Sequence, residues 1–285
     1  MATSNLAALK TAKGTSRAEG EAAVVGAVEW VAARKNLLRK EKEFMRLRDE
    51  LSRERRELPW EKVQKEYIFD GPAGKQKLSD LFGKHSQLIV YHFMFGPGWK
   101  EGCPSCSFLA DGFDGSAIHL AHRDVSFVVV SRATMPEIEA FKNRMGWQFQ
   151  WVSSFGNDFN HDYHVSFTPE ERAKGKVYYN YDMTEFPAEE APGMSVFYKN
   201  KPGEIFHTYS SYARGLDPML VTYQWLDLTP KGRDEDGLAF TMAWVRHHDK
   251  YEDGQSVDRR TPYVPPAKVD SSCCGEKETS RRSEP

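Results

Sequence analysis

Short, almost wholly apolar runs alternate in the middle of the chain with stretches whose apolar residues recur at helical spacing. Residues 88–95 and 125–130 are two such runs, which are typical of strands covered on both faces of a sheet. Residues 107–122 and 136–145 follow them and favour helices, the first of which is expected to be interrupted near Gly112 and Gly115. Residues 149–152 predict a third short strand. The order strand, helix, strand, helix, strand predicts parallel pairing with right-handed crossovers.

A second pattern, of alternating apolar and polar residues, follows this unit in the chain. Residues 194–198 and 204–209 alternate in this way and flank an Asn-Lys-Pro-Gly turn at residues 200–203, which favours a β-hairpin. Residues 67–69 predict a short strand that ends at the turn residues 70–72. The fold class that follows is α/β, with a central mixed sheet flanked by helices.

Residues 18–58 contain no proline and repeat apolar side chains along one face of a helix, which Pro59 ends. We expect a solvated, amphipathic helix that lies on its own domain. A coiled-coil homodimer and a nucleic-acid contact through basic residues stay open as alternatives. Acidic residues alternate with the basic ones, which favours the solvated helix. The apolar positions are Trp30, Leu37, Phe44, Leu47 and Leu51, and the basic ones are Arg53, Arg55 and Arg56.

The boundaries of these patterns divide the chain into four parts. We expect a disordered N-terminus, a helical arm, a folded α/β domain and a disordered tail, over residues 1–17, 18–60, 61–250 and 251–285. The N-terminus lacks the apolar segment of a secretory signal. A weak organelle transit peptide is the alternative to a disordered segment there.

Composition restricts the partners of the chain. Among its 285 residues the formal net charge is −2, and 13% are aromatic. This charge gives no global basic field for nucleic acid, and the aromatic residues support a folded core. No apolar run approaches the roughly 20 residues that span a bilayer. We therefore expect no nucleic-acid or membrane partner. Four cysteines are too few for a secreted disulfide scaffold, so we expect a cytoplasmic protein.

Two of the four cysteines stand where a buried strand is expected to meet a helix. Cys103 and Cys106 follow the first apolar run and a Gly-Pro-Gly turn, and a helix-forming stretch comes after them. Such a C-x-x-C pair near a βαβ unit is typical of thioredoxin-like redox proteins. Unpaired N–H groups and the helix dipole favour a thiolate at a helix N-terminus. We expect Cys103 to attack a disulfide, Cys106 to resolve the mixed disulfide, and Pro104 to restrict the turn, with no cofactor.

Two other interpretations of the pair stay open. Cys103, Cys106, His119 and His122 have the spacing C-x2-C-x12-H-x2-H, which nearly matches a zinc finger with its three to five residues between histidines. The apolar positions of such a finger are not in place, and the preceding run resembles a sheet strand. The other alternative is a pair of inert buried cysteines. The redox interpretation is favoured because inert cysteines need no such context.

The irregular, aromatic region of residues 154–190 is a further candidate for function. Asp158, His161 and Asp162 lie in it, and they are candidates to line a substrate pocket beside the cysteines or to bind a metal. A loop packed by its own aromatic side chains is the alternative to a pocket. The sequence does not decide between these two interpretations.

The C-terminal part of the chain holds two more pairs of reactive side chains. His247 and His248 are expected to cap a terminal element. Cys273 and Cys274 lie in the tail, where they are candidates to resolve an oxidised Cys103, to bind a metal or to carry a lipid. Incidental cysteines in a solvated tail are favoured over these three roles.

One stretch of the chain resembles the C-terminal part of a thioredoxin. It has a proline, a strand, a Lys-Asn turn, a second strand and a helix in this order, in the residues APGMSVFYKNKPGEIFHTYSSYARG. In thioredoxins that proline is cis and lies against the cysteine pair, and Pro192 holds the matching position. An ordinary loop proline is the alternative.

Longer strings resemble a more specific family of thioredoxin-like predicted dithiol–disulfide oxidoreductases, catalogued as a domain of unknown function. They include LIVYHFMFGPGWKEGCPSCSF, HLAHRDVSFVVVSRA and MGWQFQWVSSFGNDFN, and the resemblance covers about residues 30–250. It implies a thioredoxin-like fold that follows the N-terminal helical extension, and a redox pair at Cys103 and Cys106. It names no substrate.

Departures from ordinary thioredoxins bear on the expected redox properties. Gly102 holds the place of the tryptophan that precedes the first cysteine in thioredoxins, and Trp99 lies upstream of it. The dipeptide between the cysteines is Pro-Ser rather than Gly-Pro. Lys100 stands where peroxiredoxins have threonine, which argues against ordinary peroxidase chemistry. Trp99, Pro104 and Pro192 are the candidates for binding or positioning a substrate.

The sequence therefore predicts a thiol–disulfide oxidoreductase. Its partners would be a protein or small-molecule disulfide and an unidentified electron donor. One alternative is a thiol-dependent reductase or peroxidase of a small molecule. Another is a non-catalytic binding protein, because a fold does not fix a function.

Overall fold

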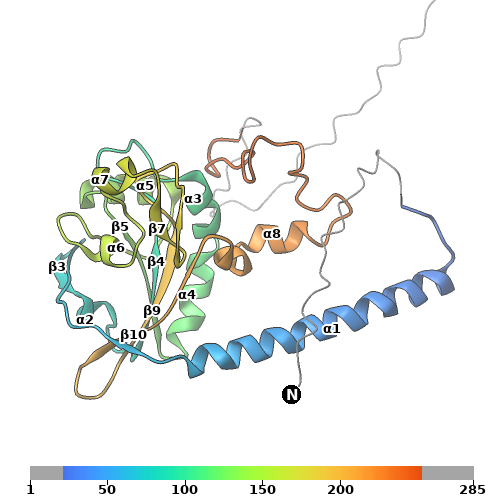
Figure 1. The fold of residues 1–285 in the computed structure, drawn as a ribbon, viewed down its shortest axis with the longest axis horizontal. Helices are drawn as coiled ribbons and strands as arrows, with labels where there is room; N and C mark the ends of the chain where they lie inside the picture. The colour runs from blue at the N-terminus through green and yellow to red at the C-terminus, as the bar shows by residue number, and fades with distance from the viewer. Residues whose placement is uncertain (1–21, 252–285) are drawn as a thin grey trace, which may run out of the picture. The chain divides into compact units, whose positions relative to one another are not determined.

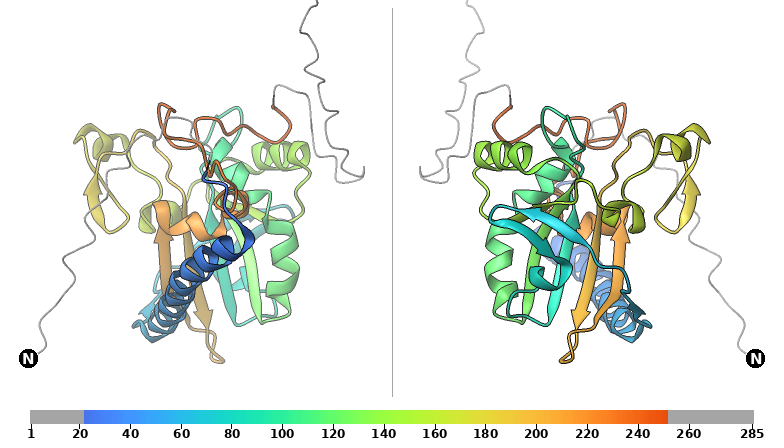
Figure 2. Two further views of the ribbon diagram at one scale, coloured as in Figure 1. Left: turned by 90° about the vertical axis from the view of Figure 1, so that its right-hand side faces the viewer. Right: turned by 90° about the vertical axis from the view of Figure 1, so that its left-hand side faces the viewer.

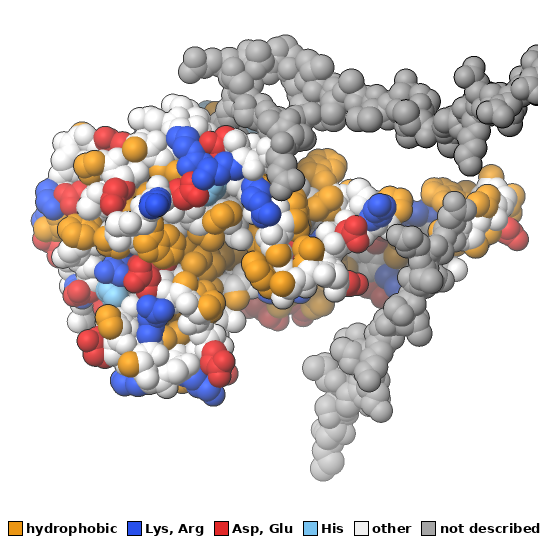
Figure 3. Space-filling model, turned by 90° about the horizontal axis from the view of Figure 1, so that it is seen from above, with side chains coloured by type: hydrophobic (Ala, Val, Ile, Leu, Met, Phe, Trp, Pro, Cys, Tyr) orange, Lys and Arg blue, Asp and Glu red, His pale blue; other side chains and the backbone are white. Residues whose placement is uncertain are grey.

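The computed structural model describes residues 22–251, and the chain divides into two compact units after Glu57. The first unit contains one helix, α1 (Ala27–Glu57), in which no side chain is buried. Residues 22–26 are not helical, so this helix begins later than the predicted start near residue 18. Apolar side chains lie among charged ones on its surface (Figure 3). The helix is amphipathic in sequence, but its apolar residues are exposed.

The second unit is built on an eight-stranded mixed sheet with the order β1-β10-β9-β4-β5-β6-β2-β3. Three central strands, β4 (Gln87–His92), β5 (Val125–Ser131) and β6 (Gln150–Ser153), run parallel to one another. Helices connect them, so the predicted strand–helix alternation and its parallel pairing are confirmed. Most residues of these strands are buried because both faces of the sheet are covered.

Antiparallel strands complete the sheet on both sides. The predicted hairpin is formed by β9 (Gly193–Lys199) and β10 (Ile205–Tyr212), with β9 beside β4. The short strand β1 (Glu61–Lys62) pairs with the outer edge of β10. At the opposite edge, β2 (Ile68–Gly71) pairs with β3 (Gly74–Lys77). The sequence did not predict β3, because its Gly-Lys-Gln-Lys residues are polar and lie at a sheet edge.

Helices cover both faces of the sheet. In Figure 1, α3 (Pro104–Ala110) and α4 (Phe113–Ala121) lie on one side of the strands. The short helices α2 (Leu78–Leu81) and α6 (Phe159–Asp162) lie on the other. Helix α5 (Met135–Met145) buries its apolar stripe in the same core as α3 and α4. This is the predicted thioredoxin-like fold, a mixed sheet flanked by helices.

Alternate residues of β4 enter two different cores because side chains along a strand point to opposite faces. Tyr91 packs with aromatic side chains beneath the cysteine helix, whereas Val90 packs on the opposite face. The first core contains Phe93, Phe95, Phe141, Trp147 and Trp151, and the second contains Phe69, Leu88, Val128, Phe159 and Phe197.

The predicted helix of residues 107–122 is in fact two helices, α3 and α4. The first already begins at Pro104, whose fixed φ suits the first turn of a helix. Asp111 and Gly112 separate the two, so the break falls at the first of the two predicted interruptions. Gly115, the second, lies within α4.

The region of residues 154–190 is a folded insertion rather than an open loop. After α6 it forms α7 (Pro169–Ala173) and a ribbon of β7 (Val177–Tyr179) and β8 (Asp182–Thr184). This ribbon stands away from the main sheet (Figure 2). It has a small core of its own, made by Val165, Phe167, Val177, Tyr179, Ala191 and Tyr212.

After β10 the chain forms a 3-10 helix, η1 (Ala213–Met219), and the short helix α8 (Val221–Leu226). Residues 227–251 continue without a helix or strand. No helix in the described part of the chain is both long and apolar enough to cross a membrane. The predictions for residues 1–17 and for Cys273 and Cys274 fall outside the described residues.

Candidate functional site

The loop after β4 is held at the C-terminal edge of the parallel strands. Phe93 N–H donates to the carbonyl of Val130, and Ala133 N–H donates back to the carbonyl of Phe95, at 2.9 and 2.7 Å. These bonds continue the pairing of β4 with the chain after β5. The loop then turns back, so that Cys103 N–H donates to the Met94 carbonyl at 3.0 Å. The cysteine helix therefore begins directly beside the end of the central strand.

Cys103 occupies the N-cap position of α3, and Pro104 follows as its first helical residue. Cys106 lies one turn further along and is 2% exposed, whereas Cys103 is half-buried. The two cysteines are free thiols rather than a disulfide. The spacing of three residues places the second sulfur beneath the first, because residues three apart share a helix face.

The two thiols have opposite pKa directions. A hydrogen bond from the Cys106 thiol lowers the pKa of Cys103 to about 7, and the N–H groups of Ser105 and Cys106 act in the same direction against burial. Burial raises the pKa of Cys106 well above its ordinary value, and the neighbouring Cys103 adds to this. The outer sulfur is thus the one that ionises near neutral pH, and only the thiolate is a strong nucleophile.

Gly102 precedes the cysteines because two aromatic rings leave no room for a side chain. A Cβ atom there would lie 2.5 Å from the ring of Phe93 and 2.8 Å from the ring of Phe141. Real Cβ atoms do not approach carbon so closely, so the tryptophan of ordinary thioredoxins does not fit at this position. Trp99 is turned elsewhere, and its indole N–H donates to Glu189 at 2.8 Å.

The C-terminal segment of residues 238–250 contacts the cysteine loop. His247 Nε2 lies 2.8 Å from the carbonyl oxygen of Gly102, and His248 Nδ1 lies 2.8 Å from Asp111 Oδ1. The ammonium of Lys250 donates to Glu101 at 2.6 Å. The expectation that the histidines cap a terminal element is therefore wrong, because both bind the loop and helix that carry the cysteines.

Pro192 lies at the same edge of the sheet as the cysteines. It directly precedes β9, in which Gly193 pairs with His92 at the end of β4. Its carbonyl accepts a hydrogen bond from the hydroxyl of Tyr179 at 2.8 Å. The proline therefore lies beside the start of the loop that carries the cysteines. That its peptide bond is cis stays a prediction.

A buried acid supports the segment before Pro192. Glu190 is 1% exposed, and its carboxylate accepts hydrogen bonds from Arg132 and Ser166. Burial raises the pKa of Glu190 to about 7 despite these partners. Arg132 directly follows β5, and Glu190 lies two residues before Pro192. Their hydrogen bond therefore connects the end of β5 to the segment that carries the proline.

Tyr91 is a residue of the site that the sequence analysis did not single out. It is 3% exposed on β4, and its side chain is in the core that holds Cys106. Its hydroxyl makes a hydrogen bond with the Cys106 thiol, and burial raises the pKa of Tyr91 well above its ordinary value. The available signal was its place in the apolar run, where it shares a face with Phe93 under the cysteine helix.

The metal interpretations lack the required geometry. Within residues 22–251 no three or more His, Cys, Asp or Glu side chains are close enough together to hold a metal ion. His122 instead contacts the carbonyl of Ile118 at 2.9 Å. The carboxylates of Asp158 and Asp162 both accept hydrogen bonds from Lys65 at 2.7 Å, so a lysine ammonium occupies the place between them.

Comparison with known proteins gives a family. Residues 19–251 match the family described as "Bacterial protein of unknown function (DUF899)". The chain belongs to this family. A search of the curated proteins found no match to the chain.

Solved structures give weaker likenesses. PrxQ from Xylella fastidiosa is 12% identical with a TM-score of 0.35, over 56% of this chain and 88% of its own. A protein described as thiol:disulfide interchange protein DsbE from Chlorobium tepidum is 12% identical with a TM-score of 0.36, over 58% and 97%. Peroxidoxin BcpB from Mycobacterium tuberculosis is 14% identical with a TM-score of 0.34, over 58% and 95%. At this level of similarity they add nothing about the activity of this chain.

Proposed function

We propose that the protein is a thiol–disulfide oxidoreductase in which Cys103 is the nucleophile and Cys106 the resolving thiol. The observation that carries the proposal is the division of labour between the two sulfurs. Cys103 is half-buried at the helix start with its pKa lowered to about 7, and Cys106 is buried beneath it with its pKa raised. A reactive outer thiolate and a protonated inner thiol are what such exchange requires.

The reaction follows from this arrangement in two steps. The Cys103 thiolate attacks one sulfur of a substrate disulfide, so a mixed disulfide forms and one substrate thiolate leaves. Cys106 then loses its proton and attacks the Cys103 sulfur, which releases the second substrate thiol and leaves a Cys103–Cys106 disulfide. Two electrons pass to the substrate, and an electron donor of the dithiol class must return them.

Tyr91 is placed to assist the second step. Its hydroxyl hydrogen-bonds to the Cys106 sulfur and so stabilises the buried thiolate that forms there. Pro192 and Trp99 are proposed to position the substrate. The place of Pro192 beside the end of β4 supports this more directly than the place of Trp99, whose indole is bonded to Glu189.

The test compares two single substitutions by reduction of dithionitrobenzoate and by trapping. Cys103→Ser should abolish reduction because no thiolate attacks. Cys106→Ser should still attack but hold its partner as a mixed disulfide, which non-reducing electrophoresis and mass spectrometry detect. Full activity in Cys103→Ser would refute the assignment, and stable trapping by both variants or by neither would refute the two roles.

Two assays of the wild-type protein separate the other candidate functions. A small-peroxide reductase would consume hydrogen peroxide faster than the disulfide in steady-state assays. A non-catalytic binding protein would form no reversible Cys103–Cys106 disulfide in a redox titration. We expect the disulfide to form and the disulfide substrate to be preferred.

A further inference from the structure

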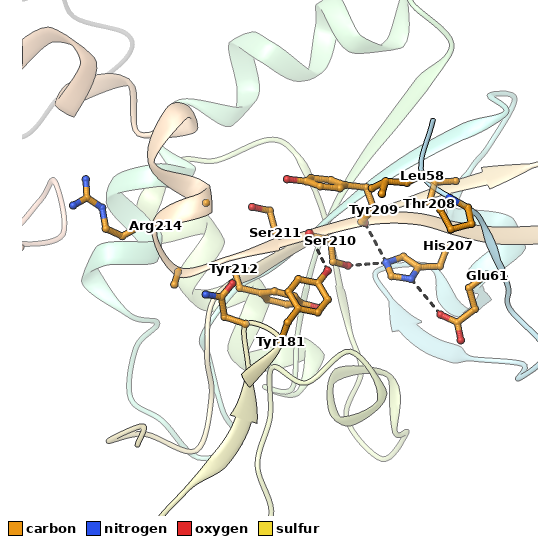
Figure 4. Close-up of a pocket in the computed structure, with 14 residues that line it drawn as sticks. Leu58, Glu61, Tyr181, His207, Thr208, Tyr209, Ser210, Ser211, Tyr212 and Arg214 are labelled. Carbon is orange, nitrogen blue, oxygen red and sulfur yellow. Dashed lines mark hydrogen bonds and ion pairs between the residues drawn. The ribbon is translucent and has the colours of Figure 1, made fainter. Parts of the chain in front are cut away.

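A chain of hydrogen-bonded polar side chains runs over β4, β9 and β10, and Figure 4 shows its outer end at His207 and Ser210. His207 Nε2 lies 2.7 Å from Ser210 Oγ, which lies 2.8 Å from Ser195 Oγ. Ser195 Oγ in turn lies 2.8 Å from Nε2 of the buried His92. At the outer end, His207 Nδ1 faces the carboxylate of Glu61 at 3.5 Å. A serine, a histidine and a carboxylate thus stand in sequence, and the thiol chemistry uses none of them.

A β-bulge creates this arrangement. His207 and Ser210 are three positions apart, so in a regular strand they would point to opposite faces of the sheet. The register shifts between His207, which pairs with Phe197, and Tyr209, which pairs with Val196. Thr208 is therefore an extra residue, and both side chains reach the same face. Bulges that turn a side chain in this way are frequent next to active sites.

The surroundings of His207 suit a general base. Its Nε2 lies 3.1 Å from the carbonyl oxygen of Tyr209, and its Nδ1 faces Glu61. Both neighbours only accept hydrogen bonds, so they stabilise the imidazolium that forms when Nε2 takes a proton. Burial lowers the pKa of His207 below its ordinary value, so the ring is an unprotonated base at neutral pH.

A cavity opens beside the pair. Its volume is about 690 Å³, within the roughly 300–1,000 Å³ of small-molecule sites. Ser210 lines it together with the aromatic rings of Tyr181, Tyr209 and Tyr212. The Tyr181 hydroxyl donates to the Ser210 carbonyl at 3.1 Å and fixes the strand at this point. Ser210 itself is 4% exposed, so only a small group reaches its hydroxyl.

We propose that Ser210 and His207 form an acyl-transfer site for small, uncharged esters. The Ser210 oxygen attacks the ester carbonyl while His207 Nε2 takes its proton. The ester C–O bond then breaks, the proton passes to the leaving alcohol, and an acyl-serine remains. Water hydrolyses this acyl-serine by the same route, so nothing is oxidised or reduced. The aromatic walls of the cavity fit an apolar ester better than a charged one.

The first experiment uses the unmodified full-length chain. A serine-directed fluorophosphonate should label one residue, and peptide mass spectrometry should place the label on Ser210. This measurement needs no substitution, so it does not depend on whether a variant folds. Absence of the label from Ser210, or a label on other residues alone, would overturn the proposal.

The second experiment measures turnover of p-nitrophenyl acetate. It uses a Cys103→Ser, Cys106→Ser background, so that no thiolate of the redox pair reacts with the ester. Ser210→Ala and His207→Gln should each lower the rate about 100-fold, the size expected for losing a nucleophile or its base. An unchanged rate in a folded Ser210→Ala variant would overturn the proposal.

Ser126→Ala is the control. Ser126 lies on β5 outside the cavity, and its hydroxyl donates to the carbonyl of Phe82 at 2.8 Å. The variant should keep both the phosphonate label and the turnover. Equal losses in folded Ser210→Ala and Ser126→Ala would show that the Ser210–His207 pair does not account for the rate, and would also overturn the proposal.

Discussion

The cysteine loop and the β10 edge each place a nucleophilic atom beside a partner that activates it, but they do so by different routes. At the cysteine loop both sulfurs belong to one short helix, and the helix start and its hydrogen bonds set their reactivity. At the β10 edge the serine and histidine come together only because an extra residue disrupts the strand pairing. A local motif is visible in the sequence, whereas a bulge is visible only in the register.

The two regions also differ in their packing. The cysteine loop lies against a dense aromatic core that includes Phe93, Phe141 and Trp147. The β10 edge borders an open cavity. Substitutions should therefore disturb stability more at the cysteine loop than at the β10 edge. The following predictions test this difference, from the largest expected effect to the smallest.

Packing at the cysteine loop predicts the largest change. Gly102→Ala should lower the free energy of unfolding by up to about 3 kcal/mol, because its methyl group would overlap the rings of Phe93 and Phe141. Urea denaturation measures the effect. Gly115→Ala on α4 is the control, since its Cβ would meet open space, and it should stabilise by about 0.5–1 kcal/mol. Equal effects of the two would contradict the packing argument.

A buried carboxyl group and an exposed one should affect the pH dependence of stability differently. Burial raises the pKa of Glu190 from 4.5 to about 7, so the protonated acid contributes stability that is full below pH 4.5 and is lost as pH rises through 7. Between pH 5 and 7.5 the wild type should lose about 2 kcal/mol more than Glu190→Gln, at about 1.4 kcal/mol per pH unit.

Urea denaturation at several pH values measures this loss. Glu61→Gln at the β10 edge is the control, because the Glu61 side chain is 81% exposed. It should leave the slope of stability against pH nearly unchanged. If stability falls with pH equally in the wild type and in Glu190→Gln, the buried acid does not cause the pH dependence.

The hydroxyl of Tyr91 should affect only the step in which Cys106 resolves the mixed disulfide. Tyr91→Phe removes the hydrogen bond that partly offsets the raised pKa of Cys106, so less thiolate is available to resolve the mixed disulfide. Release of the second thiol should slow about tenfold, equivalent to about 1.4 kcal/mol. Attack by Cys103 should keep its rate, and stopped-flow single turnover separates the two steps. Tyr178→Phe, at an exposed position of β7, should change neither rate.

The helix start predicts the smallest effect, on the ionisation of Cys103. Alkylation by iodoacetamide should have a midpoint near pH 7, because the Cys106 thiol and nearby N–H groups lower the pKa of Cys103 to about 7. Cys106→Ala removes the strongest of these contacts and should raise the midpoint. Ser105→Ala removes a weaker one and should raise it less. The reverse order would assign the lowered pKa to the wrong neighbour.

Much of the fold could be predicted from the sequence because its signals are local and periodic. The apolar runs of β4 and β5 and the stripe of α5 follow directly from side-chain spacing. The polar strand β3 was missed because strands at an edge need no apolar face. The insertion at residues 154–190 was read as irregular because its short elements are stabilised by their own small core.

The candidate sites divide in the same way. Cys103 and Cys106 could be singled out because their reactivity depends on a spacing of three residues and on a helix start. Tyr91 and Glu190 carry no such signal, since each gains its significance from a partner on another element. The histidines of the C-terminal segment were misassigned because nothing local indicates that residue 247 contacts residue 102.

By itself, the sequence determined the alternation of strands and helices and the place of the cysteine pair between a strand and a helix. Only the tertiary structure shows why residue 102 is a glycine, because the ring of Phe141, which leaves no room for a side chain there, belongs to α5. The tertiary structure also decided that Ser210 meets His207, because one extra residue in β10 turns their side chains to the same face. Periodicity records how each element faces the core, whereas contacts between elements depend on register and packing, which no local pattern encodes.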